Sequence, residues 1–527
     1  MNNETVSLPE DFHGVHIHFV GIKGTGMAAL VEILFHKGAV ITGSDVSERF
    51  YTDEVLEKLG LHAVPFAAEN ITDEVQYVIY SSAYKLDKNP DLIEAVRRGV
   101  PCLLYTQALG SYSSRAYSCG VSGVHGKTST TGLVGTILKE IDLPSQVLAG
   151  SVINSFGGTC TYTSPAVASK NTVVEPVETT VNDKKSIFVA ETCEYQRHFM
   201  SFCPQKIILT SVEPDHEDYY PTYEDIRQAF VDYICKLPEG GEVIYCADDK
   251  GACDTVSIVR GLRPDIVMIP YGEKAKNMSS HGLTGGSAQD DYCVTFGKVE
   301  NERNSFTLGL FASKGDFALS MPGRHEVLDA AAAVALVCRL LVTYGKNPLD
   351  FYENIKAGLL NFSGGKRRSE KVGQFTNGNG ADVIVLDDYG HHPTAVKTTL
   401  EGYREFYKGR KIIIDFMSHT YSRTQALLNE FAHCFTAADE VILHKIYSSA
   451  RENPADFEIT GRTLYEAVLA TGQKNVHYYE EILDAADFTK AELEKPLDAT
   501  KYPDGYLFIT MGAGDNWKLG KEILENK

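Results

Sequence analysis

Residues Cys119-Gly-Val-Ser-Gly-Val-His-Gly-Lys-Thr-Ser-Thr-Thr131 carry the strongest signal in the chain. An apolar run from Ala116 to Val121 precedes the glycines Gly123 and Gly126, and apolar residues at helical spacing follow them. The order is therefore a strand, a glycine turn and a helix N-terminus. Backbone N–H groups in such a turn, with the helix dipole behind them, form a site for an anion.

This turn is predicted to bind nucleotide phosphates. Its spacing is a shortened phosphate loop, because Val121 stands where the general pattern has its first glycine. Lys127 can contact the β- and γ-phosphates, and the Thr128 hydroxyl can bind magnesium. An incidental glycine turn is the alternative, but strand, glycines, Lys-Thr and helix all occur in order. The predicted loop residues are Gly123, Val124, His125, Gly126, Lys127, Thr128 and Ser129.

Length, composition and charge limit the possible classes of protein. The 527 residues are enough for about three domains, and 43% hydrophobic residues can build a core in each. No apolar stretch reaches the roughly 20 residues of a membrane span, and the N-terminus is polar, so we expect a cytoplasmic protein with no membrane contact. Eleven cysteines without a C-x-x-C pair indicate reduced thiols and no structural metal. The net charge of −20 disfavours nucleic acid and favours a small anionic substrate held by local groups such as Lys127.

A second glycine turn lies near the N-terminus, after the alternating strand pattern of residues 15–20. The glycine order is G-x-x-G-x-G, which favours a nucleotide diphosphate over NAD. The strand pattern of residues 39–42 is followed by Asp45, an acid suited to hydrogen-bond a ribose hydroxyl. The pattern of residues 75–81 ends at Ser81 and Ser82, which would bind ligand or, alternatively, cap a helix. The predicted ligand-binding residues of this region are Gly21, Lys23, Gly24, Thr25, Gly26, Ser44, Asp45, Ser81 and Ser82.

Carboxylates and a histidine follow two strand patterns after the phosphate loop. Glu191 and Glu194 follow residues 186–190, and His216 ends the segment Glu213-Pro-Asp-His216 after residues 206–210. Side chains of this kind beside a phosphate loop suit a hard cation, although Glu191 and His216 could also be ordinary loop residues. The aperiodic segment from Cys160 to Lys185 is predicted to be a surface insertion.

The remaining sequence predicts one more α/β unit. Helical patterns begin at Gly323 and Pro348, and strand patterns then recur at residues 381–387, 411–415, 440–443 and 506–510. Strands that alternate with helices indicate a parallel sheet. Polar residues crowd two of its strand ends, at 387–393 and 418–423.

With these residues assembled, the chain resembles the Mur ligase family over nearly its whole length. The motifs that carry the resemblance are Gly21-x-x-Gly-x-Gly-Met27, Gly123-Val-His-Gly-Lys-Thr128, Glu213-Pro-Asp-His216, Phe362-Ser-Gly-Gly-Lys-Arg-Arg368, Asp387-Asp-Tyr-Gly-His-His-Pro-Thr394 and Phe416-x-x-His-x-Tyr-x-Arg-Thr424. The resemblance implies an α/β fold with three domains. These are an N-terminal Rossmann-like domain for a UDP substrate (residues 1–113), a central P-loop-type ATP-binding domain (114–362) and a C-terminal Rossmann-like domain for an amino acid (363–527).

The resemblance also implies a reaction that uses ATP and Mg²⁺. The lactyl carboxylate of UDP-N-acetylmuramate is a poor electrophile and is first phosphorylated to an acyl phosphate. The amine of L-alanine then attacks, giving an amide, ADP and phosphate, as a step of bacterial peptidoglycan synthesis. The expected partners are these small molecules, and the expected assembly is a monomer or a homodimer.

Roles follow for the residues that match the family motifs. Those implied to be catalytic are Lys127, His216, Asp388, Arg368 and His391. The magnesium ligands would be Thr128, Glu191 and His216, and the nucleotide would be held from the C-terminal side by Arg368 and Asp388. Tyr389, His391 and Arg423 would lie near the incoming amino acid, where an arginine can grip a carboxylate with two hydrogen bonds.

The chain departs from the family pattern at several positions. Glu326 and Asp329 stand where relatives carry two asparagines that meet the adenine, and Thr420 replaces an arginine. Ionised carboxylates could accept a hydrogen bond from the adenine amino group but could not donate one to N7. A solvated helix face is the alternative for both acids. The second acidic positions after Glu191 are altered, and no counterpart of the carbamoylated lysine of some relatives is found after His216.

Two other functions stay open at this point. A recycling ligase that joins a tripeptide to the same sugar nucleotide would share all of these motifs. A catalytically silent nucleotide-binding regulator would fit the altered positions, but the intact Lys127, Thr128, Glu191, His216 and Asp388 favour an enzyme.

Overall fold

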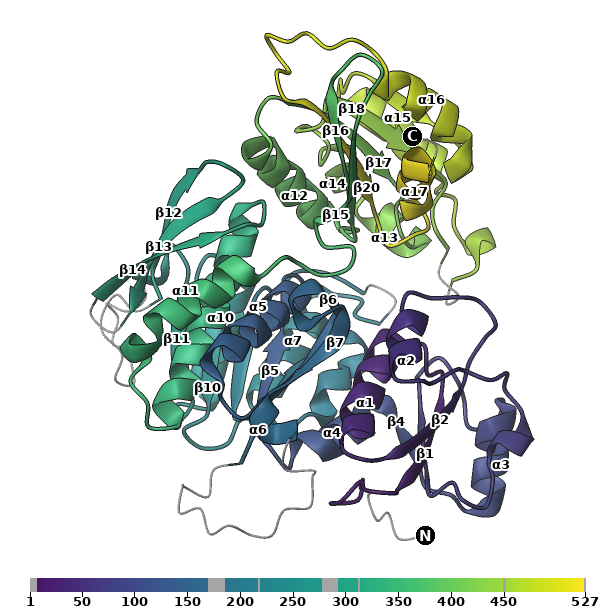
Figure 1. Cartoon of the computed structure of the whole chain (residues 1–527), viewed down its shortest axis with the longest axis vertical. Helices are drawn as coiled ribbons and strands as arrows, with labels where there is room; N and C mark the ends of the chain where they lie inside the picture. The colour runs from purple at the N-terminus through teal and green to yellow at the C-terminus, as the bar shows by residue number, and fades with distance from the viewer. Residues whose placement is uncertain are drawn as a thin grey trace.

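The computed structural model describes residues 7–168, 185–216, 219–276, 292–310, 313–448 and 452–525. Its sheets follow one another along the chain, and Figure 1 shows the last of them above the other two α/β units. Within the described residues, no helix is both long enough and apolar enough to traverse a bilayer.

The N-terminal unit is a four-stranded parallel sheet in the order β2-β1-β3-β4. Its strands are β1 (His16–Val20), β2 (Val40–Ser44), β3 (Tyr77–Tyr80) and β4 (Cys102–Leu104). Its helices are α1 (Thr25–His36), α2 (Asp53–Lys58), α3 (Pro90–Arg98) and α4 (Tyr105–Ser113), with a 3₁₀ turn at Ala68–Asn70. Because the strands are parallel, their carboxyl ends bring the glycine turn, Asp45 and Ser81 to one edge of the sheet.

The central unit is a seven-stranded sheet in the order β11-β10-β9-β5-β8-β6-β7. All neighbours are parallel except β7, which pairs antiparallel with β6 at the edge. The strands are β5 (Tyr117–Ser122), β6 (Ser145–Ile153), β7 (Thr159–Thr163), β8 (Ile187–Glu191), β9 (Lys206–Leu209), β10 (Glu242–Cys246) and β11 (Val267–Tyr271). The phosphate loop follows β5, so it lies in the middle of the sheet edge.

Helices and a small second sheet complete this unit. The helices are α5 (Lys127–Ile141), α6 (Pro165–Ala168), α7 (Tyr223–Ile234), α8 (Lys250–Leu262), α10 (Arg324–Thr343) and α11 (Tyr352–Asn361), with 3₁₀ turns at Asn154–Phe156, Tyr195–Ser201 and Pro348–Phe351. The three-stranded antiparallel sheet contains β12 (Val294–Val299), β13 (Asn304–Leu310) and β14 (Ser313–Leu319).

The start of the predicted surface insertion is instead part of the central sheet. Cys160 lies in β7 and is buried, and its N–H donates to Glu32 Oε2 of α1 at 3.0 Å. Burial raises the pKa of Glu32 to about 7. The prediction was wrong here because an edge strand paired on one side has little periodicity in its sequence. Residues 169–184 of the predicted insertion lie outside the described residues.

The C-terminal unit is a six-stranded sheet in the order β15-β16-β20-β17-β18-β19, in which only β15 is antiparallel to its neighbour. The strands are β15 (Glu370–Thr376), β16 (Asp382–Asp388), β17 (Arg410–Phe416), β18 (Glu440–Leu443), β19 (Val476–Tyr478) and β20 (Gly505–Met511). The helices are α12 (Pro393–Phe406), α13 (Tyr421–Ala426), α14 (Leu428–Ala432), α15 (Gly461–Ala470), α16 (Ala486–Leu493) and α17 (Trp517–Glu525), with 3₁₀ turns at Pro454–Asp456 and Ile482–Ala485.

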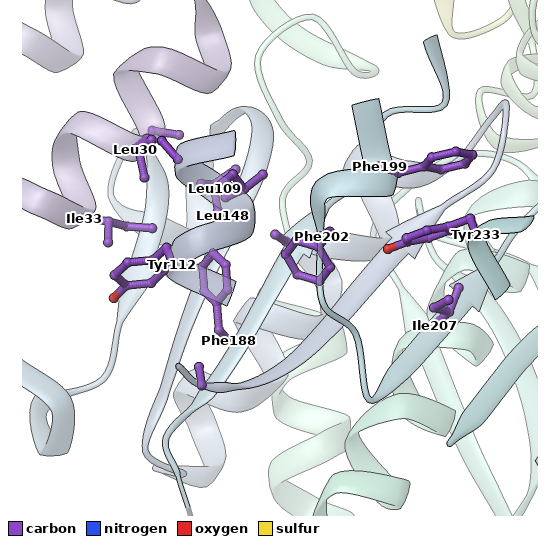
Figure 2. Close-up of a cluster of buried hydrophobic side chains, with 14 of the residues drawn as sticks. Leu30, Ile33, Leu109, Tyr112, Leu148, Phe188, Phe199, Phe202, Ile207 and Tyr233 are labelled. Carbon is purple, nitrogen blue, oxygen red and sulfur yellow. The ribbon is translucent and has the colours of Figure 1, made fainter. Parts of the chain in front are cut away.

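One apolar core joins the first two units. Figure 2 shows part of it, with Leu30 and Ile33 of α1 and Tyr112 of α4 packed toward Phe188 and Phe202 of the central unit. The apolar clusters of the C-terminal unit are instead built from residues between 375 and 524. The N-terminal and central units are therefore packed as one body, and the C-terminal unit has its own core.

Candidate active site between the central and C-terminal units

The phosphate loop has the geometry that its glycines predicted. Gly123 has φ 133° and Gly126 has φ 79°, which favour glycine. A Cβ on Gly123 would clash with the Thr210 hydroxyl, and one on Gly126 would clash with the Asp329 carboxyl group. The loop therefore needs glycine at both positions, and α5 begins directly after it.

Lys127 lies across this loop. Its Nζ donates to the carbonyl oxygens of Gly123 and Val124 and lies 3.0 Å from Glu194 Oε2. Burial alone would lower the pKa of Lys127, but nearby acidic groups, Glu194 first among them, together outweigh burial and raise it. The cation is therefore held in place by the loop that would bind the phosphates.

The predicted metal ligands form two adjoining groups. The Thr128 hydroxyl donates to Glu191 Oε2 at 2.9 Å, and the same oxygen accepts from Gly150 N at 2.8 Å. His216 Nε2 lies 3.4 Å from Glu194 Oε1, in a group that also contains Asp215. A hydroxyl and a carboxylate are oxygen donors of the kind that Mg²⁺ prefers, so Thr128 and Glu191 fit this ion.

Several C-terminal residues face these groups across a cavity of about 920 Å³. Predicted site residues that line it are His125, Gly126, Lys127, Thr128, Ser129, Glu191, His216, Glu326, Asp329, Arg368, Asp388, Tyr389, His391 and Arg423; Val124 lines it as well. They come from positions more than 290 residues apart in the sequence. The fold therefore brings the phosphate loop and the residues predicted to bind the amino-acid substrate to one cavity.

Asp388 and Arg423 already have partners in this structure. Asp388 Oδ2 accepts from Ser369 N and Asp388 Oδ1 from Gly390 N, both at 2.7 Å. Arg423 Nη2 donates to Asp215 Oδ1 at 2.6 Å, which joins α13 to the central unit. Burial would raise the pKa of Asp215, but Arg423 holds it well below its usual range.

Arg368, Tyr389 and His391 lie beside one another in the same cavity. The Arg368 guanidinium carbon is 5.2 Å from the centre of the Tyr389 ring, a cation–π contact. His391 Nδ1 is 2.8 Å from the Tyr389 carbonyl oxygen. Burial, followed by the charge of Arg423, lowers the pKa of His391 well below its usual value, so this imidazole is neutral at pH 7.

Glu326 and Asp329 are buried at the start of α10, which contradicts the solvated-face alternative. Ser129 Oγ donates to Glu326 Oε1 at 3.0 Å. Burial raises the pKa of Glu326 to about 7, and burial with the charge of Glu326 raises that of Asp329 well above its usual value. Burial therefore disfavours having both carboxylates ionised at once. A protonated carboxyl group both donates and accepts hydrogen bonds, as asparagine does.

The predicted residues of the N-terminal unit form a separate cluster and do not line this cavity. Lys23 N donates to Asp45 Oδ2 at 2.8 Å, and the Thr25 hydroxyl is 2.5 Å from the Tyr51 hydroxyl. The Ser44 hydroxyl lies 3.4 Å from His18 Nε2. The cluster also contains Gly21, Gly24 and Gly26 of the turn, and Ser81 with Ser82 after β3.

Helix capping does not explain the serine pair. The next helix, α3, begins at Pro90 and is capped by Asn89, whose side chain accepts from Leu92 N at 3.2 Å. Ser81 Oγ instead accepts from Ala83 N at 3.3 Å. Ala83 is the residue of this unit that reaches the 920 Å³ cavity.

The lining residues that were not assigned to the site from sequence include Asp215, Ser369, His325 and His392. Asp215 and His392 lie inside the family motifs at 213–216 and 387–394, and this position could have assigned them to the site. Ser369 follows the Lys-Arg-Arg run directly. No local pattern shows that Asp215 pairs with an arginine 208 residues away.

The sequence matches three domain descriptions of one family. They are "Mur ligase family, catalytic domain" over residues 16–117, "Mur ligase middle domain" over 121–337 and "Mur ligase, glutamate ligase domain" over 367–500.

Similar proteins span the whole chain. A UDP-N-acetylmuramate–L-alanine ligase of Treponema pallidum (strain Nichols) is 44% identical over 522 residues, which cover 99% of this chain and 98% of the relative. A ligase of the same name from Borreliella burgdorferi is 35% identical, covering 96% of this chain and 97% of the relative.

Solved structures share the fold. A UDP-N-acetylmuramate-alanine ligase from Thermotoga maritima has a TM-score of 0.69 at 22% identity, and a murein peptide ligase from Psychrobacter arcticus has 0.62 at 20%. In both comparisons 97% of this chain and 98% of the other chain are covered.

Proposed function

The chain belongs to the Mur ligase family, and we propose that it uses ATP to join L-alanine to the lactyl carboxylate of UDP-N-acetylmuramate in peptidoglycan synthesis. The 44% identity with an L-alanine ligase over 99% of the chain carries this proposal. The cavity supports it, because one wall is a phosphate loop and the other presents an arginine that can bind the carboxylate of an amino acid.

The domain roles follow from this reaction. Residues 1–113 would bind the UDP substrate at the glycine turn, residues 114–362 would bind ATP, and residues 363–527 would supply the amino-acid site. Both ATP and the sugar nucleotide are cytoplasmic metabolites, so the proposed location is the cytoplasm.

Lys127 would act on the phosphoryl group that moves to the lactyl carboxylate. Its Nζ, now 3.0 Å from Glu194, would turn toward the γ-phosphate and compensate the charge that develops during transfer. The backbone N–H groups of residues 126–128 would hold the remaining phosphates in place. The product of this step is an acyl phosphate, whose carbonyl carbon is electrophilic.

Mg²⁺ would be held by Thr128, Glu191 and His216. The bound ion would supply positive charge that offsets the negative charge of the phosphates. Gly150 positions Glu191 for this role, because its N–H donates to Oε2 at 2.8 Å and any larger residue would clash with the carboxylate.

The amino-acid half of the reaction would need an exchange of partners. Arg423 now donates two hydrogen bonds to Asp215, at 2.6 and 3.2 Å. The carboxylate of L-alanine would take over these donors, with His391 and Tyr389 beside it. The ammonium group of L-alanine must lose a proton before its amine can attack, and the neutral imidazole of His391 would lie beside it. Arg368 and Asp388 would contact the nucleotide from the same side.

A tripeptide ligase is the second candidate, because the Psychrobacter arcticus structure has the same fold. Phosphate release with ATP and UDP-N-acetylmuramate separates the two. We expect release to depend on free L-alanine, with glycine and serine used less well and tripeptide not at all. Release that requires tripeptide would overturn the choice of acceptor, and release with no acceptor dependence would overturn the ligase assignment.

A further inference from the structure

A second group of possible metal ligands lies in the cavity, apart from the predicted magnesium residues. It contains His125 of the phosphate loop, Glu213 after β9, and His392 at the start of α12. His125 Nε2 lies 3.5 Å from Glu213 Oε2, and His392 Nδ1 lies 4.0 Å from the same oxygen. The two imidazole rings are 4.9 Å apart, centre to centre. Two domains therefore contribute to one cluster.

The side chain of His392 is unusual for a residue so deeply buried. Only 7% of it is exposed, and its Nε2 makes no hydrogen bond within the described part of the chain. Its Nδ1 accepts one long hydrogen bond, of 3.4 Å, from Thr394 N. A buried polar atom without a partner is unfavourable, which points to a ligand for this ring.

The ionisation states of His392 and Glu213 suit a metal ion. Burial, with His125 beside it, lowers the pKa of His392 to about 4, so the imidazole is neutral at pH 7 and has a lone pair to donate. Burial would raise the pKa of Glu213, but His125 lowers it below its usual value, so the carboxylate is ionised. Metal binding needs ligands in these deprotonated states.

We propose that His125, Glu213 and His392 form a binding site for a divalent transition metal of the zinc class. Two imidazoles and a carboxylate are a known zinc ligand set that leaves a fourth position for water. Ligand atoms around a tetrahedral zinc ion lie about 3.4 Å apart, given bonds of about 2.0–2.1 Å. All three ligand atoms here already lie within 4.8 Å of one another, so side-chain shifts of about 1 Å complete the site. Mg²⁺ prefers oxygen ligands and is disfavoured.

A bound ion would connect the two parts of the molecule. His125 and Glu213 belong to the central unit, whereas His392 caps the first C-terminal helix. The ion would hold these units together and slow the opening on which product release depends. Zinc therefore inhibits turnover through this cluster.

Cobalt binding to the full-length protein tests the site, because tetrahedral Co²⁺ has an intense visible absorption. Titration is done with excess Mg²⁺ present, so that the oxygen ligands are saturated. His392→Asn is the best variant, since asparagine retains the helix cap. We expect the parent to show the tetrahedral bands, and His392→Asn and Glu213→Gln each to weaken Co²⁺ binding at least tenfold. Circular dichroism confirms that the variants are folded.

Glu194→Gln is the matched control, because Glu194, Asp215 and His216 form the other possible ligand group. It should bind Co²⁺ as the parent does. The proposal would be overturned by any of three results. The parent could show no tetrahedral bands, His392→Asn and Glu213→Gln could both bind Co²⁺ as the parent does, or Glu194→Gln could be the one variant that loses binding. If the inhibition constant for zinc is the same in His392→Asn as in the parent, zinc does not inhibit turnover through this cluster.

Discussion

The N-terminal and central units meet through an apolar core, whereas the central and C-terminal units meet through charges and hydrogen bonds. In the first interface, Phe202 is 2% exposed and packs between α4 and the central sheet. In the second, Arg423 binds Asp215, and the Thr394 hydroxyl donates to Glu213 Oε2 at 3.1 Å.

The difference separates a fixed half of the site from an exchangeable half. Apolar burial stabilises an interface only while it excludes water, so the first interface resists opening. Polar groups can exchange one partner for another, including a substrate, at little cost. The phosphate loop is therefore built into a rigid body. The residues predicted to bind the amino-acid substrate lie on the C-terminal unit, which can separate from that body.

The largest expected effect is loss of the apolar interface. Phe202→Ala should destabilise the protein by about 3–5 kcal/mol, because it removes a buried ring and leaves a cavity. The melting temperature should fall by several degrees. Thr394→Ala, in the polar interface, should cost no more than about 1 kcal/mol. Equal losses in the two variants would mean that the two interfaces do not differ in kind.

Lys127→Ala tests the fixed half of the site. Turnover should fall by about 10²–10³-fold, because a preorganised charge is removed from the transferring phosphoryl group. Lys139→Ala is the control on the same helix, where Lys139 Nζ donates to the Ser155 carbonyl oxygen at the surface. The Lys127 variant should stay folded but melt at a lower temperature, because the buried Glu194 carboxylate loses its ion pair. Retained activity would show that the phosphate loop has another role.

The buried acid Glu326 should make stability depend on pH. Its pKa is raised in the folded state to about 7, so its contribution is complete below pH 4.5 and is lost as pH rises through 7. Glu326→Gln should remove this loss, which is at most about 3 kcal/mol at pH 8. Melting temperatures of parent and variant should therefore diverge between pH 5 and 8, with the variant more stable at pH 8. Parallel curves would mean that the carboxyl group is not desolvated.

Arg423→Ala tests the exchangeable half. The KM for L-alanine should rise about tenfold, a modest change because Arg423 must first leave Asp215. Affinity of the full-length protein for UDP-N-acetylmuramate should stay unchanged. Arg404→Ala, which removes an ion pair with Asp439 inside the C-terminal unit, is the control and should not alter this KM. A matching loss of affinity for both substrates would contradict the separation of the two sites.

Local sequence patterns predicted much of this fold. Residues 206–210 and 440–443 were predicted as strands, and β9 (Lys206–Leu209) and β18 (Glu440–Leu443) match these bounds to within one residue. The phosphate loop was recognised because its strand, glycines and helix are contiguous. The β12–β14 sheet was not predicted, because β12 has mainly exposed or half-buried residues and lacks a clear alternation.

Other features of the site depend on tertiary packing and could not be read from the sequence. Asp215 is paired because the fold brings the loop after β9 to Arg423 of α13. The raised pKa of Asp329 comes from its burial at the start of α10, with the charge of Glu326 beside it. The roles given to the predicted site residues stay predictions until substrates are bound.

The fate of the carboxylate oxygens tests the central proposal most directly. UDP-N-acetylmuramate labelled with ¹⁸O at both lactyl carboxylate oxygens is converted with ATP and L-alanine, and the released phosphate is examined by mass spectrometry. Attack of this carboxylate on ATP, followed by displacement of phosphate by the amine, transfers one labelled oxygen to each phosphate and leaves the other in the amide. Phosphate without ¹⁸O would contradict an acyl phosphate and, with it, the role proposed for the phosphate loop.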